Sequence, residues 1–256
     1  MKLQTQALLT AVLLVLGTAT RADDKVLVFS KTEGFRHASI AQGQQMLQGI
    51  ADSLGASLEI TEDSARFTPA ELARFRAVVS LSTTGDVLNS AQQAAFEAWI
   101  EAGGGYVGIH AAADCEYDWP WYGAQVLGNG AWFRSHPAIQ AATLIREPAI
   151  DVSTAHLPAS FSFTDEWYNF RANPRAGAEV LLRIDESSYS PGNGAMGEDH
   201  PISWKRSVGG GRAWYTALGH RNESFADMRF VLHVRGGLLW AMGREGAIFG
   251  NGFEPD

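Results

Sequence analysis

Apolar positions in the first half of the chain follow two periods that alternate along the sequence. One set of segments has the length and apolar content of buried strands: 25–30, 57–63, 76–82 and 105–110. The segments between them carry apolar residues at helical spacing or helix start and stop signals: 39–55, 68–75 and 89–105. Strands alternating with helices predict a parallel sheet that is covered by helices on both faces.

The second half of the chain has a different pattern. Residues 115–140 are rich in aromatic side chains and turn formers, and three short strands are expected after them, at 142–148, 161–170 and 178–185. Residues 200–220 place two strand-like runs around a glycine turn, which is typical of a hairpin, and 224–243 has the pattern of an amphipathic helix. With no repeat and no clear linker, we expect one domain whose sheet has an elaborated, β-rich edge.

The net charge and the N-terminal segment indicate which classes of partner and which compartment to expect. The 256 residues carry a net charge of −8 and no basic run, so neither nucleic acid nor an anionic membrane is an expected partner. Residues 1–22 combine a lysine, a short apolar run and a small-x-small site, which predicts a secretory signal peptide cut after Ala22. The mature chain, 23–256, is then periplasmic or secreted, without stable membrane insertion. The run is short for a bilayer span, although an uncleaved anchor is the alternative.

The chain has a single cysteine, which limits both the disulfides it can form and the thiol chemistry it can perform. An exported chain with Cys115 alone has no internal disulfide, so its core must supply the stability. A nucleophilic role for this thiol is the weaker interpretation. Its place five residues past the predicted strand end is more typical of a small buried side chain inside a helix.

The stretch 103–114, GGGYVGIHAAAD, places a histidine where a buried strand turns sharply into a new helix. Small neighbours make such a turn sterically possible, and the turn pushes its central side chain out at the edge of the sheet. In hydrolases and amidotransferases of related layout this point holds Ser or Cys. His110 can instead serve as a general base, donate to an oxyanion or bind a metal. The structural alternative is a histidine that caps the helix and bonds a backbone carbonyl.

Other candidate residues follow predicted strands and should lie at the same sheet edge, where ligands of open α/β sheets bind. His37 and His220 end two strand segments and join His110 as candidate catalytic or metal-binding residues. No local zinc motif is present, so a divalent metal such as zinc would be held by side chains from separate loops. Asp165 and Glu166 are adjacent in a predicted strand, so at most one of these two acids faces the site.

Carboxylates, arginine and aromatic rings in the same loops indicate a carbohydrate ligand, because sugars present C–H faces to rings and hydroxyls to polar groups. The candidate substrate-binding residues are Arg36, Asp114, Trp119, Trp121, Tyr122, Trp167, Tyr168 and His200. An ordinary aromatic core is the alternative, since the chain has eight tryptophans. The remaining histidines are expected to be structural: His136, His156 and His233.

Taken together, the motifs of this chain resemble those of the ThuA-like, trehalose-utilisation family. The resemblance spans about residues 25 to 243 and rests on FRH, GGGYVGIHAAAD, YDWPWYG, TDEWYNFR, DHPISW, GGGRAWYTALGH and GGLLWA. It implies a flavodoxin-like fold of the class I glutamine amidotransferase type. True amidotransferases of that type carry cysteine at the turn, so His110 argues against glutamine hydrolysis. The resemblance also implies a link to disaccharide catabolism and to 3-keto-glycosides.

These expectations combine into one mechanistic hypothesis and two alternatives. A ketone at C3 of a glycoside acidifies the proton at C2, a histidine removes it, and the group at C1 leaves by elimination before water adds back. A divalent metal held by His37, His110 and His220 would stabilise the enolate, and Asp165 or Glu166 would orient substrate or act as acid. The alternatives are a carbohydrate-binding protein without turnover and a glycoside hydrolase that uses two carboxylates. The sugar, its linkage and the oligomeric state are not predicted.

Overall fold

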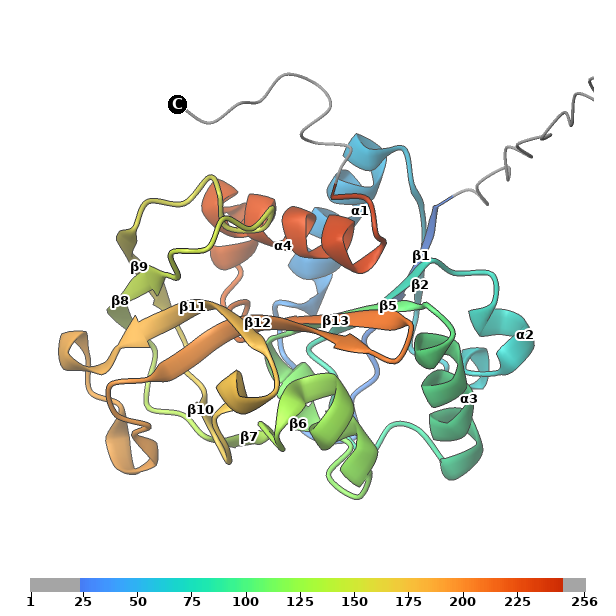
Figure 1. Ribbon diagram of the computed structural model, residues 1–256, viewed down its shortest axis with the longest axis horizontal. Helices are drawn as coiled ribbons and strands as arrows, with labels where there is room; N and C mark the ends of the chain where they lie inside the picture. Colours follow the sequence, from blue (N-terminus) through green and yellow to red (C-terminus); the bar gives the residue numbers. More distant parts are fainter. Residues whose placement is uncertain (1–23, 246–256) are drawn as a thin grey trace, which may run out of the picture.

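The computed structural model describes residues 24–245, which form a three-layer α/β arrangement (Figure 1). The helices of this part of the chain are α1 (Ile40–Leu54), α2 (Pro69–Leu72), α3 (Ser90–Glu101) and α4 (Met228–Ala241). Its strands are β1 (Lys25–Phe29), β2 (Ser57–Thr61), β3 (Ala77–Leu81), β4 (Thr84–Gly85), β5 (Gly105–Ile109), β6 (Asp114–Cys115), β7 (Phe133–Ser135), β8 (Gln140–Arg146), β9 (Ser160–Asp165), β10 (Asn169–Phe170), β11 (Glu179–Asp185), β12 (His200–Val208) and β13 (Gly211–Thr216).

A single large sheet organises the described residues, with nine strands in the order β2-β1-β3-β5-β13-β12-β11-β8-β9. The first five are parallel and follow the flavodoxin order, in which the chain reverses direction across the sheet beside its first strand. The last four are antiparallel and form the elaborated edge. The predicted fold class, a parallel sheet with helices on both faces and a β-rich extension, is therefore confirmed.

Helices cover both faces of the parallel half. α1 and α4 lie on one side of the sheet, and α3 lies on the other with the π-helical segment Tyr122–Gly128 (Figure 1). α4 packs against β13 and β5. The close approach depends on Gly237, where a Cβ would lie 2.4 Å from the ring of Trp214. The central strands β3 and β5 are buried along their whole length, which explains why they are nearly continuous apolar runs in the sequence.

Local signals in the sequence account for the element boundaries. α1 ends at Gly55, whose left-handed φ of 64° closes the helix. α3 begins with a capping box in which Asn89 and Gln92 exchange side-chain and backbone hydrogen bonds. The hairpin of β12 and β13 turns at Gly209-Gly210 as expected.

Three expectations about local structure are corrected. The helix expected over 68–75 is a single turn, Pro69–Leu72. The turn at His110 continues as a 3-10 turn, His110–Ala113, and then as the short strand β6, so Cys115 lies in a strand and not in a helix. The strand expected over 161–170 breaks after Asp165, because the chain leaves the sheet there and pairs again only at β10 with β7.

Two expectations about the N-terminal segment lie outside the described residues. The predicted signal peptide, 1–22, and its cleavage after Ala22 lie there entirely. Within residues 24–245, no helix has both the length and the apolar character needed to cross a bilayer.

Candidate functional site: a histidine and glutamate cluster

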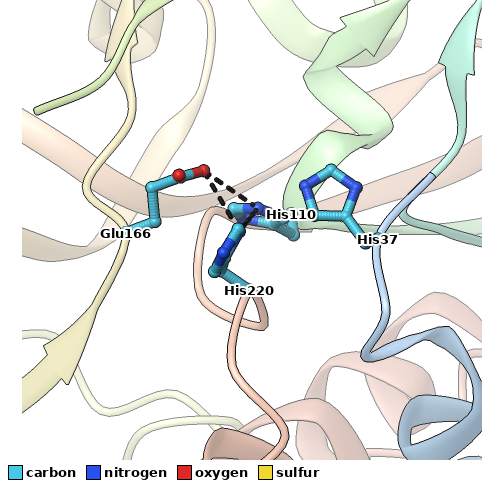
Figure 2. A group of neighbouring side chains, drawn as sticks. All are labelled: His37, His110, Glu166 and His220. Atoms are coloured by element: carbon cyan, nitrogen blue, oxygen red, sulfur yellow. Dashed lines mark hydrogen bonds and ion pairs between the residues drawn. The ribbon is translucent and has the colours of Figure 1, made fainter. Parts of the chain in front are cut away.

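Three parallel strands deliver histidines to one edge of the sheet. His37 follows β1, His110 follows β5 directly, and His220 follows β13. Parallel strands have their carboxyl ends at the same edge, and the structure brings these three side chains together as the sequence predicts. Glu166 joins them from the segment after β9, so the antiparallel extension completes the cluster (Figure 2).

The turn after β5 fixes the ring of His110. The residue has a φ of 52°, in the left-handed region that side chains rarely adopt, and its side chain is fully buried. Its Nδ1 lies 2.7 Å from the carbonyl oxygen of Ala217, which can only accept, so Nδ1 carries the proton and donates it. Nε2 faces His220 and Glu166, and the Tyr168 ring packs on the imidazole at 4.3 Å between ring centroids. The backbone contact expected of a structural histidine thus orients His110 toward the cluster.

The polar atoms of the cluster lie close together. His110 Nε2 is 3.3 Å from His220 Nδ1 and 3.5 Å from Glu166 Oε2, and His220 Nδ1 is 3.2 Å from that same oxygen (Figure 2). The His37 ring stands edge-on to its neighbours, with centroids 4.7 Å from His110 and 5.2 Å from His220. One ligand atom from each of the four residues lies within 4.8 Å of the others.

Burial and mutual repulsion hold His37 neutral. Its pKa falls to about 3, first because burial penalises the charged imidazolium and then because His110 and His220 are close by. The Nδ1 of His37 is buried, and no group of residues 24–245 bonds it. A buried polar atom without a partner is costly unless something binds it, so this nitrogen is suited to a ligand that the protein alone does not supply.

The carboxylate of Glu166 is the only negative charge in the cluster. Burial acts to raise its pKa, but the neighbouring imidazoles of His110 and His220 outweigh burial and hold the pKa well below its usual range. The hydrogen bond to Glu166 raises the pKa of His220, against the opposing effect of burial. The glutamate is ionised at neutral pH and attracts positive charge, either an imidazolium or a bound cation.

The adjacent acid, Asp165, has a separate role. Its buried carboxylate accepts hydrogen bonds from the backbone amides of Gly219, at 2.9 Å, and His220, at 3.2 Å, and from the Ser224 hydroxyl at 2.9 Å. It also accepts from the amide of Glu166. The two acids thus bind different groups of the same loop, since Asp165 contacts its backbone and Glu166 contacts the ring of His220. Glu166 belongs to the cluster, whereas Asp165 positions the loop that carries His220 and is not itself a member.

His136, which the sequence analysis assigned a structural role, contacts the cluster. Its Nδ1 lies 3.0 Å from Glu166 Oε1, the oxygen that the other histidines leave free, and 2.9 Å from the carbonyl of Pro137. Both partners are acceptors, so Nδ1 carries a proton and donates it, while Nε2 makes neither of these contacts. The side chain is 43% exposed. The only sequence signal was its SHP context in an aromatic loop, which does not distinguish it from other histidines.

The prediction that aromatic residues bind the substrate is corrected, because most of these rings are buried. Trp119, Tyr122 and Trp167 are almost fully covered by protein, so their faces are closed to a sugar. Trp119 packs against Phe96 of α3 and stacks on the partly buried Trp121. Tyr168 is also buried, but against His110. These rings form the core and its boundary, which is the alternative that a chain rich in tryptophan left open.

Two polar candidates, His200 and Arg36, have partners within the protein. His200 is buried between Glu186 and the carbonyl of Tyr168, so it holds the scaffold and is not open to a ligand. Arg36 is exposed and makes a two-point ion pair with Glu62.

The last candidate from the sequence is Asp114, and His233 and His156 are the histidines that were expected to be structural. Asp114 is half-buried and accepts a 2.6 Å hydrogen bond from Tyr117, and burial raises its pKa. His233 is buried in the core with both nitrogens bonded, as expected of a structural residue. His156 is exposed and bonds the carbonyl of Arg229.

The cluster has the donors and the spacing of a metal site. Imidazole and carboxylate are typical ligands of zinc and similar divalent ions. Ligands about 2.0–2.1 Å from one ion at tetrahedral angles lie about 3.4 Å apart, and the three close pairs are separated by 3.2, 3.3 and 3.5 Å. The carbonyl that holds His110 Nδ1 is the outer contact that orients metal-binding histidines. These four side chains could hold a metal ion.

The fold and the cluster define an α/β protein of flavodoxin-like architecture with a His/Glu group at the carboxyl edge of its sheet. Residues 25–241 match the ThuA family, described as trehalose utilisation, and the chain belongs to that family. No protein of curated function matches it in sequence.

Solved structures with the same fold include ThuA-like proteins. A putative ThuA-like protein from Bacteroides uniformis is 26% identical, with a TM-score of 0.73 over 86% of this chain and 92% of the other. A second, from Parabacteroides merdae, is 20% identical, with a TM-score of 0.70 over 86% and 90%. A β-galactosidase from Bacillus circulans sp. alkalophilus has a TM-score of 0.56 at 13% identity over 88% of this chain and 31% of its own, which reflects the fold alone.

Proposed function

We propose that this chain is an exported enzyme that cleaves a disaccharide or 3-keto-glycoside by metal-assisted and histidine-assisted elimination, followed by hydration. The observation that carries the proposal is the tetrahedral spacing of His110 Nε2, His220 Nδ1 and Glu166 Oε2. The family's description, trehalose utilisation, supports a glycoside as the substrate class. The sequence of residues 1–22 supports export.

The cluster suits an enolate-forming step. A ketone at C3 acidifies the C2 proton, and removing that proton places negative charge on the ketone oxygen. A divalent cation held by His37, His110, His220 and Glu166 would supply the positive charge that stabilises this oxygen. The enolate then expels the group at C1, which leaves with a proton, and water adding across C1 and C2 completes a net hydrolysis. His37, with its low pKa, is in the neutral form that binds a cation.

We assign removal of the C2 proton to His136. Glu166 Oε1 and the Pro137 carbonyl fix its Nδ1–H, so the lone pair of Nε2 is the proton acceptor. A carboxylate that orients a histidine base in this way is a recurring catalytic arrangement. The ring is 43% exposed, so substrate can reach it, whereas the cluster histidines would be occupied by the cation. General base catalysis of this kind contributes about 10²–10⁴-fold to the rate.

The test separates cation binding from proton transfer. Residues 23–256 are assayed against a panel of 3-keto-glycosides and their unoxidised parents, and bound metal is measured by elemental analysis. The His110→Ala variant should lose both metal and turnover. The His136→Ala variant should keep the metal and lose turnover by about 10²-fold or more. The exposed His156, bonded to Arg229, is the control, and His156→Ala should keep both.

Three outcomes would contradict the proposal. Turnover of the parent sugars that does not depend on His110 would indicate a two-carboxylate glycoside hydrolase. Sugar binding without any turnover, unaffected by the His110 substitution, would indicate a binding protein. Full activity in protein that contains no divalent metal would exclude the assignment of the cluster to a cation.

A further inference from the structure

We propose that Phe35 is the platform on which a sugar ring of the substrate packs, an inference that rests on the proposed function of the cluster. The ring of Phe35 packs edge-on beside the ring of His37. It is 66% exposed, and its centroid lies 4.9 Å from that of His37 at an interplanar angle of 84°. Phe35 therefore offers an open apolar face directly beside a cluster histidine.

The backbone around Phe35 is fixed although its ring is exposed. The Thr84 hydroxyl donates to the carbonyl oxygen of Phe35 at 2.9 Å and accepts from the amide of Gly34 at 3.3 Å. The amide of Glu33 donates to the carbonyl of Thr84 at 2.8 Å. This segment after β1 is thus tied to the segment after β3, so the backbone from which the ring projects is fixed. A platform held in advance loses little conformational freedom when a ligand binds.

The surroundings of the ring have the polarity of a sugar site. The large hydrophobic side chains exposed within residues 24–245 are Phe35, Ile60, Ile139, Ile150 and Met228, and Phe35 alone among them is aromatic. The cleft that adjoins His37 begins at Arg36, the residue after Phe35, and its lining combines the polar side chains of Gln44 and Glu62 with Ala38, Ile40 and Ala41. A pyranose presents C–H groups on its faces and hydroxyls around its edge, so it can place a face on the ring and its hydroxyls among these side chains.

The position of Phe35 allows a second role that an experiment can separate from the first. The ring covers part of His37, which is only 5% exposed, so it could serve to shield a metal ligand from water. Shielding requires apolar bulk, whereas a platform requires a flat face. Leucine supplies bulk without a face, and tyrosine keeps both. The two roles therefore predict different results for Phe35→Leu.

The test compares Phe35 variants with wild type. Calorimetry on residues 23–256 measures the affinity of each protein for trehalose and for zinc. We expect Phe35→Ala and Phe35→Leu to weaken trehalose binding about tenfold, as for loss of contact over roughly half an aromatic side chain. Phe35→Tyr should stay within about twofold of wild type, and zinc affinity should not change in any of the three. Ile150, which is 69% exposed, provides the control, and Ile150→Ala should bind both ligands normally.

Unchanged trehalose affinity in Phe35→Ala would overturn the inference, and so would a wild-type protein that does not bind trehalose. A loss of zinc affinity in Phe35→Ala that Phe35→Leu restores would assign the ring to shielding instead. These results are independent of the turnover assay. If Phe35→Ala loses trehalose binding and no keto-glycoside is cleaved, the platform stands and the proposed enzymatic function fails.

Discussion

The substitution Asp165→Asn tests how the cluster is positioned, because it removes a charge without changing the size of the side chain. Four donors converge on the two carboxylate oxygens. Oδ2 accepts from the Gly219 amide and the Ser224 hydroxyl, and Oδ1 accepts from the amides of His220 and Glu166. An asparagine keeps one oxygen and turns an NH2 group toward the other pair. The Ser224 hydroxyl can rotate to accept from it, but a backbone N–H cannot.

The size of the effect follows from the donors that lose their acceptor. At least one buried backbone N–H is left unpaired, at a cost of about 1–3 kcal/mol, and the remaining hydrogen bonds lose their charged acceptor. We expect the free energy of unfolding to fall by about 2–4 kcal/mol. The loop that carries His220 loses its anchor, so zinc affinity should fall about 10–100-fold, the usual result of removing an outer contact of a metal ligand.

Urea unfolding of the chelator-treated protein measures the first effect, and calorimetric zinc titration of the folded protein measures the second. The exposed Asp63 accepts a hydrogen bond from the Ala65 amide at the start of a 3-10 turn, and asparagine caps such turns equally well. Asp63→Asn should therefore match wild type in both measurements. An Asp165→Asn protein with wild-type stability and wild-type zinc affinity would refute the positioning role.

Two further predictions concern the core. Burial lowers the pKa of His233 to about 4, so between about pH 6.5 and pH 4 the unfolded chain binds a proton that the folded chain does not. Stability should therefore fall as the pH falls through this window, by up to about 1.4 kcal/mol per pH unit. Urea unfolding at pH 7 and pH 5 should show a smaller difference in His233→Gln than in wild type, and equal differences would contradict the assignment. Burial also raises the pKa of Cys115 to about 12, so a thiol reagent should label it only after unfolding; fast labelling of the folded protein would show that the thiol is accessible.

The histidines at the strand ends were predictable because their placement follows from a rule of sheet geometry. Apolar runs predict the buried strands, and apolar residues at helical spacing predict the helices between them. Parallel strands then have their carboxyl ends at one edge of the sheet. His37 and His110 follow two such strands, so their shared edge could be predicted. The strand before His220 was predicted only as one arm of a hairpin, and its parallel pairing with β5 is known from the structure. Local signals also placed the ends of α1 and the start of α3, where glycine and asparagine have specific backbone roles.

The sequence could not predict which of the two adjacent acids, Asp165 or Glu166, belongs to the histidine cluster. Strand geometry predicts that Asp165 and Glu166 point in opposite directions, but it does not say which of them faces the histidines. That depends on how β9 is placed in the antiparallel extension and on where the chain leaves the sheet. The carboxylate beyond the last strand residue reached the cluster, and the one within the strand bonded the loop after β13.

The accessibility of aromatic rings was likewise decided by tertiary structure. Trp119, Tyr122 and Trp167 have the composition of a sugar site, yet each is enclosed, whereas the less conspicuous Phe35 is open. A ring is buried or exposed according to what packs on it from segments distant in the chain, and no local pattern in a loop encodes that. The sequence by itself determined the parallel half of the sheet, the succession of strands and helices along the chain, and the sheet edge at which His37 and His110 lie. Only the tertiary structure decided which acid joins them, that His136 contacts that acid, and which ring faces solvent, because these depend on long-range packing.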